Sequence, residues 1–283
     1  MNIISSIQEM HQERDCWSAP VGFVPTMGYL HEGHLSLVRR ARAENNKIVV
    51  SIFVNPTQFG HGEDLQRYPR DIENDLELLR NEGVDAVFYP EVAEMYPPGY
   101  STWVSVERLT DKLEGASRPG HFRGVATVCN KLFNIVRPAK SYFGQKDAQQ
   151  ALVIKRMAAD LDMGIEIVVL PTVREPDGLA MSSRNVYLDS EERKAATVLF
   201  RALKAAEELW GRGEQSANVI LGRMVALINT EPLARVEYLS VTDPDTLEKM
   251  TKIGRSALVS LAVNIGSTRL IDNIFLGIQD CSP

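Results

Sequence analysis

Two histidines near the amino terminus have a spacing suited to chemistry on a phosphate. The segment PTMGYLHEGH covers residues 25–34 and places His31 and His34 three residues apart, where an amphipathic stretch begins. At the start of a helix, side chains with this spacing point to one side. The free backbone N–H groups there favour anions, and histidines beside them can add charge or protons. We therefore interpret the segment as a phosphate-binding loop, in which Gly28 and Gly33 let the backbone approach a ligand closely.

This loop differs from the common phosphate and zinc motifs. It is neither GxGxxG nor GxxxxGK[ST], and a zinc protease needs histidines four residues apart. The alternative is that one histidine caps a helix and the other lies on the surface. The loop directly follows a predicted buried strand, 21–24, and ligands bind beyond the carboxyl ends of parallel strands. Its position therefore favours the functional interpretation.

Three further segments have residue types that suit ligand binding. Phe143–Asp147 follows a predicted strand and enters a helix, so its lysine could meet a phosphate, and its aspartate could bind a ribose or cap the helix. Met181–Asn185 contains two hydroxyls and an arginine, which suit a mobile phosphate clamp or a polar linker. Asn55–Phe59 follows another predicted strand, where Gln58 suits a small hydroxy acid or belongs to an ordinary turn.

The elements that must position these segments alternate between strand and helix in the first part of the chain. Apolar runs predict strands at 21–24, 47–54, 84–89, 141–143 and 165–170, and helical spacing predicts helices at 34–44, 70–82, 125–136 and 147–161. This alternation predicts an α/β fold, a Rossmann-like doubly wound parallel sheet covered on both faces.

The pattern changes after Pro171. Two helices are predicted in succession, at 190–210 and 217–229, and three strands follow at 236–241, 257–263 and 269–275. This order predicts a smaller C-terminal α+β domain. We expect one domain at 1–174 and a second at 175–283.

Composition excludes several classes of protein. The chain has 283 residues, 44% of them hydrophobic and 24% charged, so it can bury a core. A net charge of −6 argues against nucleic-acid binding, and no apolar run is long enough to cross a membrane. The amino terminus becomes charged too early for a secretory signal. Cys16, Cys129 and Cys281 are far apart and predict neither disulfides nor a zinc ribbon, so we expect a cytoplasmic enzyme or binding protein.

Six motifs together resemble the pantoate–β-alanine ligase family, the pantothenate synthetases. They are PTMGYLHEGH, FVNPTQF at 53–59, RYPR at 67–70, HFRGV at 121–125, YFGQKDAQQ at 142–150 and MSSRN at 181–185. They occur in the family's order and spacing, over about two thirds of the chain. HxGH alone is shared by a nucleotidylyl-transfer superfamily, whereas the combination is specific. The resemblance implies that pantoate and ATP form a pantoyl adenylate, which β-alanine converts to pantothenate.

The resemblance also assigns roles to domains and residues. It implies that 1–174 binds nucleotide and pantoate and that 175–283 is a lid. It implies that His34 is the catalytic proton donor and that Gln58 and Gln150 bind pantoate or β-alanine. It assigns ATP binding to Met27, Gly28, Tyr29, Leu30, His31, Glu32, Gly33, His34, Gly144, Gln145, Lys146, Asp147, Val173, Met181, Ser182, Ser183 and Arg184.

Within the ATP-binding set, the histidines, Lys146 and the MSSRN side chains are expected to supply donors and positive charge around the triphosphate. Gln145 and Ala148 stand where the family usually carries glutamate and an aromatic residue.

The family uses Mg²⁺ with ATP, and the resemblance implies a homodimer. Asn74 stands at a commonly acidic position, so no metal ligand is assigned. Asp71, Glu73 and Asp75 are spaced along a predicted helix and are interpreted as solvated surface charges. Arg123 could reach a phosphate or form an ion pair at a helix start.

Two other hypotheses remain open at this point. One is a nucleotidylyltransferase that leaves a nucleotide on its acceptor, against which the paired glutamines argue. The other is a catalytically silent nucleotide-binding protein, against which the intact His34, Lys146 and MSSRN segment argue.

Overall fold

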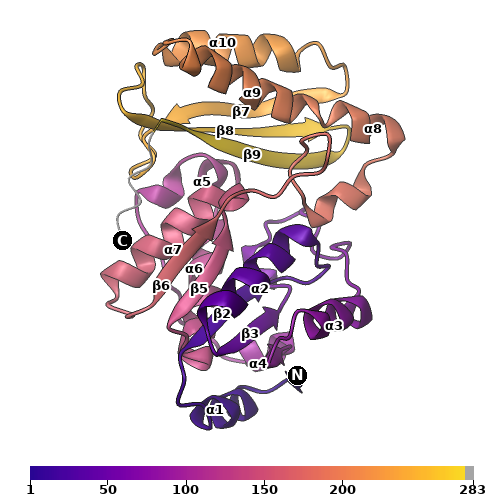
Figure 1. Ribbon diagram of the computed structural model, residues 1–283, viewed down its shortest axis with the longest axis vertical. Helices are drawn as coiled ribbons and strands as arrows, with labels where there is room; N and C mark the ends of the chain where they lie inside the picture. The colour runs from indigo at the N-terminus through magenta and orange to yellow at the C-terminus, as the bar shows by residue number, and fades with distance from the viewer. Residues whose placement is uncertain (278–283) are drawn as a thin grey trace. The chain divides into compact units, whose positions relative to one another are not determined.

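The computed structural model describes residues 1–277, and Cys281 lies outside this range. The chain divides into two compact units, Met1–Pro171 and the residues from Thr172 onward. This division falls slightly before the predicted domain boundary. Each unit has its own sheet and its own helices (Figure 1).

The first unit is built on a six-stranded, all-parallel sheet. Its strands are β1 (Asn2–Ile4), β2 (Val21–Thr26), β3 (Lys47–Ile52), β4 (Ala86–Phe88), β5 (Lys140–Gly144) and β6 (Glu166–Leu170). Their order across the sheet is β1-β4-β3-β2-β5-β6. Parallel neighbours require crossover connections, and the helical segments between these strands supply them. The predicted doubly wound sheet is confirmed.

Helices cover both faces of this sheet. They are α1 (Ile7–Asp15), α2 (Glu32–Glu44), α3 (Ile72–Asn81), α4 (Val92–Met95), α5 (Glu114–Ser117), α6 (His121–Val136) and α7 (Ala148–Asp160), with short 3-10 turns at Pro56–Gln58, Leu109–Asp111 and Gln145–Asp147. On one face, α2 and α3 pack against Val24, Val50 and Val87 of the strands. On the other face, Phe23 meets Phe133 of α6 edge to face, with ring centroids 6.3 Å apart. Successive residues of β2 thus point to opposite faces of the sheet, as the two-residue period of a strand requires.

The first strand and the first helix were not predicted from the sequence. β1 has three residues, of which only Ile4 is buried, so it carries no readable alternation. The sequence does contain a signal for the start of helix α1. Ser6 and Glu9 form a reciprocal capping box, the S-x-x-E pattern of a helix start. The strand at 21–24 is therefore the second strand in chain order.

The second unit has a three-stranded antiparallel sheet in the order β7-β8-β9. Its elements are α8 (Ser190–Ala195), α9 (Val198–Gly211), α10 (Ala217–Ile228), β7 (Ala234–Thr242), β8 (Ser256–Ile265) and β9 (Thr268–Gly277), preceded by a 3-10 turn at Ser183–Tyr187. The single helix predicted at 190–210 is wrong, because the chain interrupts it at Ala196 and Thr197. The Thr197 hydroxyl donates to the Lys194 carbonyl at 2.8 Å, a local bond that competes with helix continuation.

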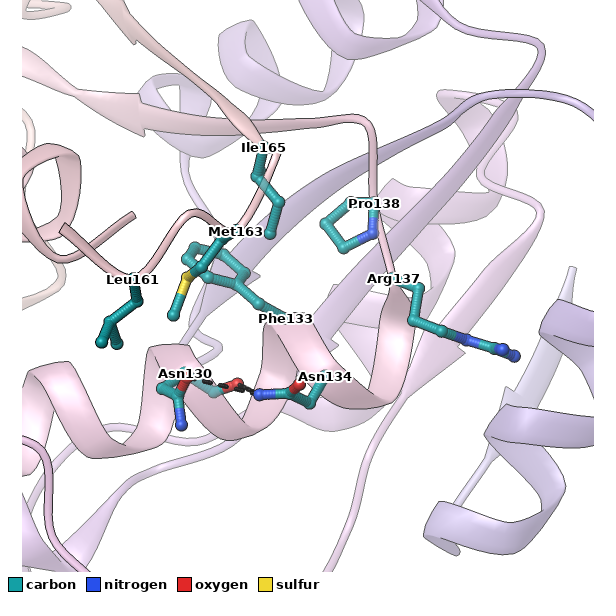
Figure 2. Close-up of a pocket in the computed structure, with 8 residues that line it drawn as sticks. All are labelled: Asn130, Phe133, Asn134, Arg137, Pro138, Leu161, Met163 and Ile165. Carbon is teal, nitrogen blue, oxygen red and sulfur yellow. Dashed lines mark hydrogen bonds between the residues drawn. The ribbon is translucent and has the colours of Figure 1, made fainter. Parts of the chain in front are cut away.

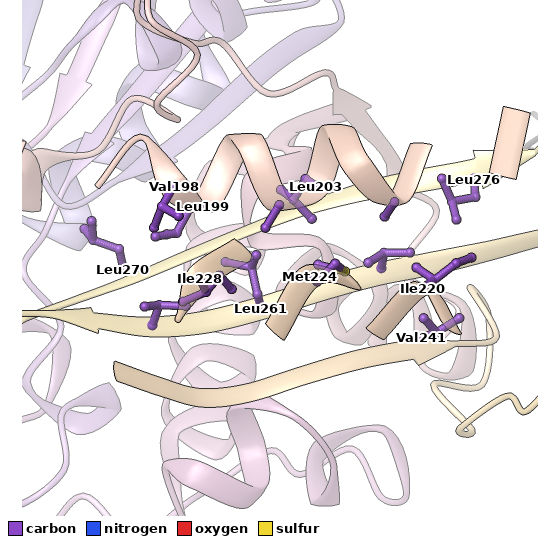
Figure 3. Packing of buried hydrophobic residues seen from close by; sticks show 14 of the residues in the cluster. Val198, Leu199, Leu203, Ile220, Met224, Ile228, Val241, Leu261, Leu270 and Leu276 are labelled. Carbon is purple, nitrogen blue, oxygen red and sulfur yellow. The ribbon is translucent and has the colours of Figure 1, made fainter. Parts of the chain in front are cut away.

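The core of the second unit lies between its helices and one face of its sheet (Figure 3). Leu203 of α9 and Met224 of α10 meet strand residues such as Val241 and Leu261, and all four are buried. Truncating a buried leucine of this kind to alanine typically costs about 2–5 kcal/mol. This cluster therefore provides much of the stability of the second unit.

Candidate active site

The predicted ligand-binding loops leave neighbouring strands at the carboxyl edge of the parallel sheet. Chain order runs outward from β2 to β3 and β4 on one side, and from β5 to β6 on the other. The connections after β2 and β5 therefore diverge to opposite faces and leave a crevice between them, the usual ligand position in such sheets. Met27–His34 follows β2 and Gly144–Asp147 follows β5. The fold thus brings these two segments together.

The loop after β2 has an unusual backbone conformation that several side chains hold. Gly28 and Tyr29 both have positive φ, 80° and 52°, a region that non-glycine residues rarely adopt. The Thr26 hydroxyl donates to the Ser51 carbonyl at 2.7 Å and accepts from the Gly28 amide at 3.2 Å. Asp75, from α3, accepts from the next two amides of the loop. The conformation is therefore fixed from both β3 and α3.

His31 and His34 lie side by side at the start of α2. Their ring centroids are 4.0 Å apart. His31 is the N-cap, and its Nδ1 accepts from the Gly33 amide at 3.1 Å. The Nδ1 of His34 accepts from the His31 amide at 3.3 Å. With both Nδ1 atoms bound to backbone N–H groups, each ring carries its proton on Nε2, the atom left to meet a ligand.

Electrostatics keep both rings neutral. Burial, followed by the Lys146 ammonium, lowers the pKa of His31 to about 4, against a smaller opposing effect of Asp147. Burial, His31 and Lys146 lower the pKa of His34 well below its ordinary value. Near neutral pH the histidines are therefore neutral hydrogen-bond donors, and positive charge on them around a triphosphate stays a prediction. The Lys146 ammonium therefore acts electrostatically on both rings.

The loop after β5 supplies the charge. Lys146 and Asp147 lie in the 3-10 turn Gln145–Asp147, and the Lys146 ammonium is 4.0 Å from the Asp147 carboxylate. A Cβ placed on Gly144 would have no protein atom within 4 Å, and its φ is negative. Neither packing nor backbone conformation therefore requires glycine there, whereas close approach of a ligand would.

The other residues of the predicted ATP set differ in what they can offer. Leu30 is buried in the core, so only its backbone faces the loop. Glu32 is exposed and pairs with Arg39 of its own helix. The Met27 sulfur accepts from the Gln58 Nε2 at 3.1 Å. The backbone and the histidines are therefore the groups of this loop left to meet a ligand.

Gln58 is held by a network that the sequence analysis did not find. Its side-chain oxygen accepts from the buried amide of Asn55 at 3.1 Å. Its backbone carbonyl accepts from Nδ1 of His121 at 2.8 Å. A Cβ on Gly124 would lie 2.3 Å from the Thr57 carbonyl, so glycine lets α6 approach this segment. Gln58 is thus fixed next to the loop after β2.

The two neighbouring glutamines of α7 differ in burial and in hydrogen bonding. Gln149 is buried, accepts from the Glu114 amide at 3.0 Å and donates to the carbonyls of Leu109 and Lys112, each at 2.8 Å. Gln150 is half-buried, and its side-chain amide has no hydrogen-bond partner within residues 1–277. Gln149 therefore belongs to the scaffold, while Gln150 can bind a ligand.

Val173 and Met181–Arg184 belong to the second unit, where a short hairpin brings them together. The Met181 amide donates to the Val173 carbonyl at 3.0 Å, and Arg174 and Ala180 form an antiparallel bridge. Asp272 anchors this hairpin by accepting from Arg174 at 2.6 and 3.0 Å. Ser182 then caps the following turn through the Arg184 amide.

Two charged side chains lie elsewhere than expected. Asp75 is 1% exposed, so its interpretation as a solvated surface charge is wrong. Its position gave a signal, because Ile72, Asp75, Leu76 and Leu79 have the spacing of one helix face, which places a carboxylate within an apolar stripe. Arg123 stacks over Trp103, with 4.9 Å from Cζ to the ring centroid, and forms no ion pair within residues 1–277, whereas a contact with a phosphate stays a prediction.

A cavity of about 460 Å³ lies at the other edge of the sheet, where β5 and β6 begin. Asn130, Phe133, Asn134, Arg137, Pro138, Leu161, Met163 and Ile165 line it (Figure 2). Its two asparagines bond to each other, and Figure 2 shows the Arg137 side chain extending away from the apolar residues. None of the predicted site residues lines this cavity.

The described part of the chain shows neither a metal cluster nor a membrane span. Within residues 1–277, no group of three or more His, Cys, Asp or Glu side chains is placed to hold a metal ion. No helix of this part is long and apolar enough to cross a membrane. Cys16 is exposed and Cys129 is buried, and both are free thiols.

The chain is thus an α/β protein with a doubly wound parallel sheet and an HxGH loop after its inner strand β2. A model of the family described as pantoate-beta-alanine ligase matches residues 2–275. The pantothenate synthetase of Roseiflexus castenholzii is 60% identical over 276 residues, which cover 98% of this chain and 99% of that protein. The chain therefore belongs to the pantoate–β-alanine ligase family, as its motifs predict.

Solved structures agree. Pantothenate synthetase from Thermus thermophilus superposes with a TM-score of 0.93 at 50% identity, over 97% of this chain and 99% of that one. The pantoate-beta-alanine ligase of Francisella tularensis, solved with beta-gamma ATP and beta-alanine, has a TM-score of 0.80 at 35% identity, and 97% of each chain is covered. The family match and the structural similarity thus agree.

Proposed function

We propose that this chain condenses pantoate with β-alanine in two steps that use ATP. In the first, a pantoate carboxylate oxygen attacks the α-phosphorus, the bond to the β-phosphate oxygen breaks, and pyrophosphate leaves. In the second, the β-alanine amine attacks the activated carbonyl, the bond to AMP breaks, and pantothenate forms. AMP is a far better leaving group than oxide, which is why the carboxylate must be activated.

The observation that carries this proposal is the meeting of two loops at the crevice between β2 and β5. One loop offers two neutral histidines with free Nε2–H groups, and the other offers the Lys146 ammonium, which acts electrostatically on both. Such fixed donors and charge favour a transition state in which negative charge builds on the phosphates. His34 is the proposed catalytic donor, and the backbone from Met27 to Gly33 with Gly144–Asp147 would line the nucleotide.

The acid substrate is proposed to bind beside this loop through two amides. Gln58 and Gln150 can orient the hydroxyls of pantoate without adding a charge that opposes its carboxylate. Gln58 is already fixed by Asn55 and Met27, and the Gln150 amide is left available within the described residues. This difference supports a pocket in which Gln58 forms a rigid side and Gln150 forms an adaptable side.

The second unit is proposed to contribute a clamp on the triphosphate. Val173 and Met181–Arg184 share one hairpin, so they would move as a single body. We expect Val173 to meet the adenine and the serines and Arg184 to meet phosphates.

Mg²⁺ is proposed to enter with ATP. Because no cluster of three ligating side chains exists among residues 1–277, the phosphates would hold most of its coordination sphere, as is common for this ion. It would neutralise charge on the leaving pyrophosphate. A homodimer and a cytoplasmic location complete the proposal and follow from the resemblance to the family.

Exchange of labelled pyrophosphate into ATP tests the mechanism. We expect exchange to require pantoate and Mg²⁺ but not β-alanine, and addition of β-alanine to yield AMP and an amide. Exchange without pantoate, or exchange that needs β-alanine, would overturn the two-step order. A stable nucleotidyl product would identify a nucleotidylyltransferase instead.

A further inference from the structure

We propose that Asp75 is a positioning residue for adenylation, because its carboxylate fixes the backbone turn that presents His31 and His34. The inference rests on the proposed function of this loop. It gives a role to a residue of α3 that does not belong to the ligand-binding segments themselves.

Asp75 uses both carboxylate oxygens on consecutive amides of one loop. Oδ2 accepts from the Tyr29 amide at 2.8 Å, and Oδ1 accepts from the Leu30 amide at 2.7 Å. The side chain is 1% exposed, and it forms no ion pair within the described residues. A buried carboxylate without a cation is unfavourable for folding. An apolar residue would suit this helix face better, so the carboxylate is explained by the turn that it holds.

The turn requires such a partner. Tyr29 has φ of 52°, a left-handed conformation that is strained for a residue with a side chain. Gly28 precedes it with φ of 80°, and a Cβ there would lie 2.9 Å from Asp75 Oδ2 and 3.0 Å from Ile52 Cγ2. The carboxylate therefore lies directly against the backbone of Gly28, where only glycine leaves room.

The held peptides are next to the catalytic pair. Leu30 directly precedes His31, whose side chain caps α2 and whose amide binds Nδ1 of His34. A change in the Tyr29–Leu30 backbone would thus turn the His31 amide and move both rings. Asp75 acts on the histidines through the main chain, with no contact to either ring required.

Replacement of Asp75 by asparagine tests this role. Asn keeps the size, but an NH₂ donor replaces one of the two accepting oxygens and would face the N–H that this oxygen binds. We expect Asp75→Asn to lower the rate of pantoate-dependent pyrophosphate exchange about 10- to 100-fold, the range for a lost bond to a charged acceptor. The KM for pantoate should change less than about twofold, since Gln58 and Gln150 remain in place and their hydrogen bonds set that affinity.

Two variants of the same helix are matched controls. Glu73→Gln removes an exposed carboxylate two residues away and should leave the rate unchanged. Asp71→Ala removes the N-cap bond to the Asn74 amide and weakens α3 without touching the loop. If Asp71→Ala lowers the rate as much as Asp75→Asn, Asp75 acts only through helix stability and the proposal is wrong.

Amide hydrogen exchange gives a readout that needs no active variant. In the unaltered chain, the Tyr29 and Leu30 amides should exchange slowly although they lie outside any helix or strand. In Asp75→Asn, exchange should accelerate in a peptide covering residues 27–31 and not in β3. Fast exchange of both amides in the unaltered chain, or a uniform increase across the first unit, would overturn the proposal. Absence of pantoate-dependent exchange in the unaltered chain would overturn the proposed function instead.

Discussion

The two units bury polar groups in different ways. In the first, buried or half-buried polar groups surround loops at the edge of a parallel sheet, including His31, His34, His121 and Asp75. Several keep a donor or acceptor directed at backbone or at open space. In the second unit, the deeply buried carboxylate of Asp272 forms an ion pair with Arg174. Burial lowers the pKa of three histidines in the first unit, whereas in the second unit a buried ion pair anchors a hairpin.

The distribution of histidines follows the same division. All five histidines of the chain, residues 11, 31, 34, 61 and 121, lie in the first unit. The second unit therefore contains no histidine. Changes to histidines are therefore informative in the first unit, and a change to the buried ion pair of Asp272 is informative in the second.

The largest expected effect is on the catalytic loop. His34→Asn keeps an acceptor near the position of Nδ1 but removes the Nε2–H donor. We expect adenylation to slow about 10²- to 10⁴-fold, the usual contribution of such a group. Single-turnover formation of pantoyl adenylate measures this. His11→Ala, an exposed histidine of the same unit, is the control. If folded His34→Asn formed pantoyl adenylate at a near-native rate, His34 would not be the catalytic donor.

The next effect separates a buried ion pair from an exposed one in the second unit. Arg174→Met removes a cation that donates two hydrogen bonds to the 1% exposed Asp272 carboxylate, and should lower the free energy of unfolding by about 3–5 kcal/mol. Arg193→Met breaks the exposed pair with Asp177 and should cost less than about 1 kcal/mol. Hydrogen exchange in β8 during denaturant titration measures both. Equal losses would contradict the role given to Asp272.

A third effect is acid sensitivity of the first unit. Burial, followed by the Arg118 guanidinium, lowers the pKa of His121 to about 4 from 6.5. Between these values the unfolded chain binds the proton and the folded chain does not, so stability must fall as pH falls from 6.5 to about 4. His121 alone contributes up to about 3 kcal/mol over this window.

His121→Asn isolates that contribution. Asn places an amide donor near the position of Nδ1, the atom that binds the Gln58 carbonyl, but it does not titrate. The slope of unfolding free energy against pH should decrease in this variant by up to about 1.4 kcal/mol per pH unit. Denaturant titrations at several pH values between about 4 and 6.5 measure the slope. An unchanged slope would show that His121 is protonated in the folded chain.

The smallest effect distinguishes two adjacent glutamines. Gln150→Ala should weaken pantoate binding about 5- to 150-fold, by the loss of one or more hydrogen bonds to the substrate, with little change in ATP affinity or Tm. Gln149→Ala should instead destabilise the fold by about 1–3 kcal/mol and leave the pantoate affinity of the folded fraction unchanged. Calorimetric titration with each ligand and thermal unfolding make the comparison. If Gln150→Ala lost affinity for ATP as well as for pantoate, the proposed position of the pantoate pocket would be wrong.

The sequence predicted the fold wherever elements were long and periodic. The strand at Lys47–Ile52 and the helix at Ile72–Asn81 had clear patterns, whereas the three residues of β1 could not show one. The break at Ala196 and Thr197 lies within a continuous helical hydrophobic pattern, so periodicity does not register it.

For the site, motifs located the loops but not their electrostatics. Whether His31 is charged depends on its burial and on Lys146, which lies in the loop after another strand. The sequence around His31 therefore does not predict its charge. Asp75 is different, because its place in an apolar stripe was visible in the sequence. A charged residue at a core position of an amphipathic helix is itself a signal that the carboxylate has a partner to hold.

The order of strands in the first unit also has a consequence for synthesis on the ribosome. Asn2 pairs with Ala86, and the central strand β2 acquires its second neighbour only with Lys140 and Ser141. At about 5–20 residues per second, the nascent chain must wait several seconds with an incomplete sheet. Unpaired strand edges attract other strands. We therefore expect nascent chains that stop before β5 to depend on chaperones, while those that extend past β6 fold on their own.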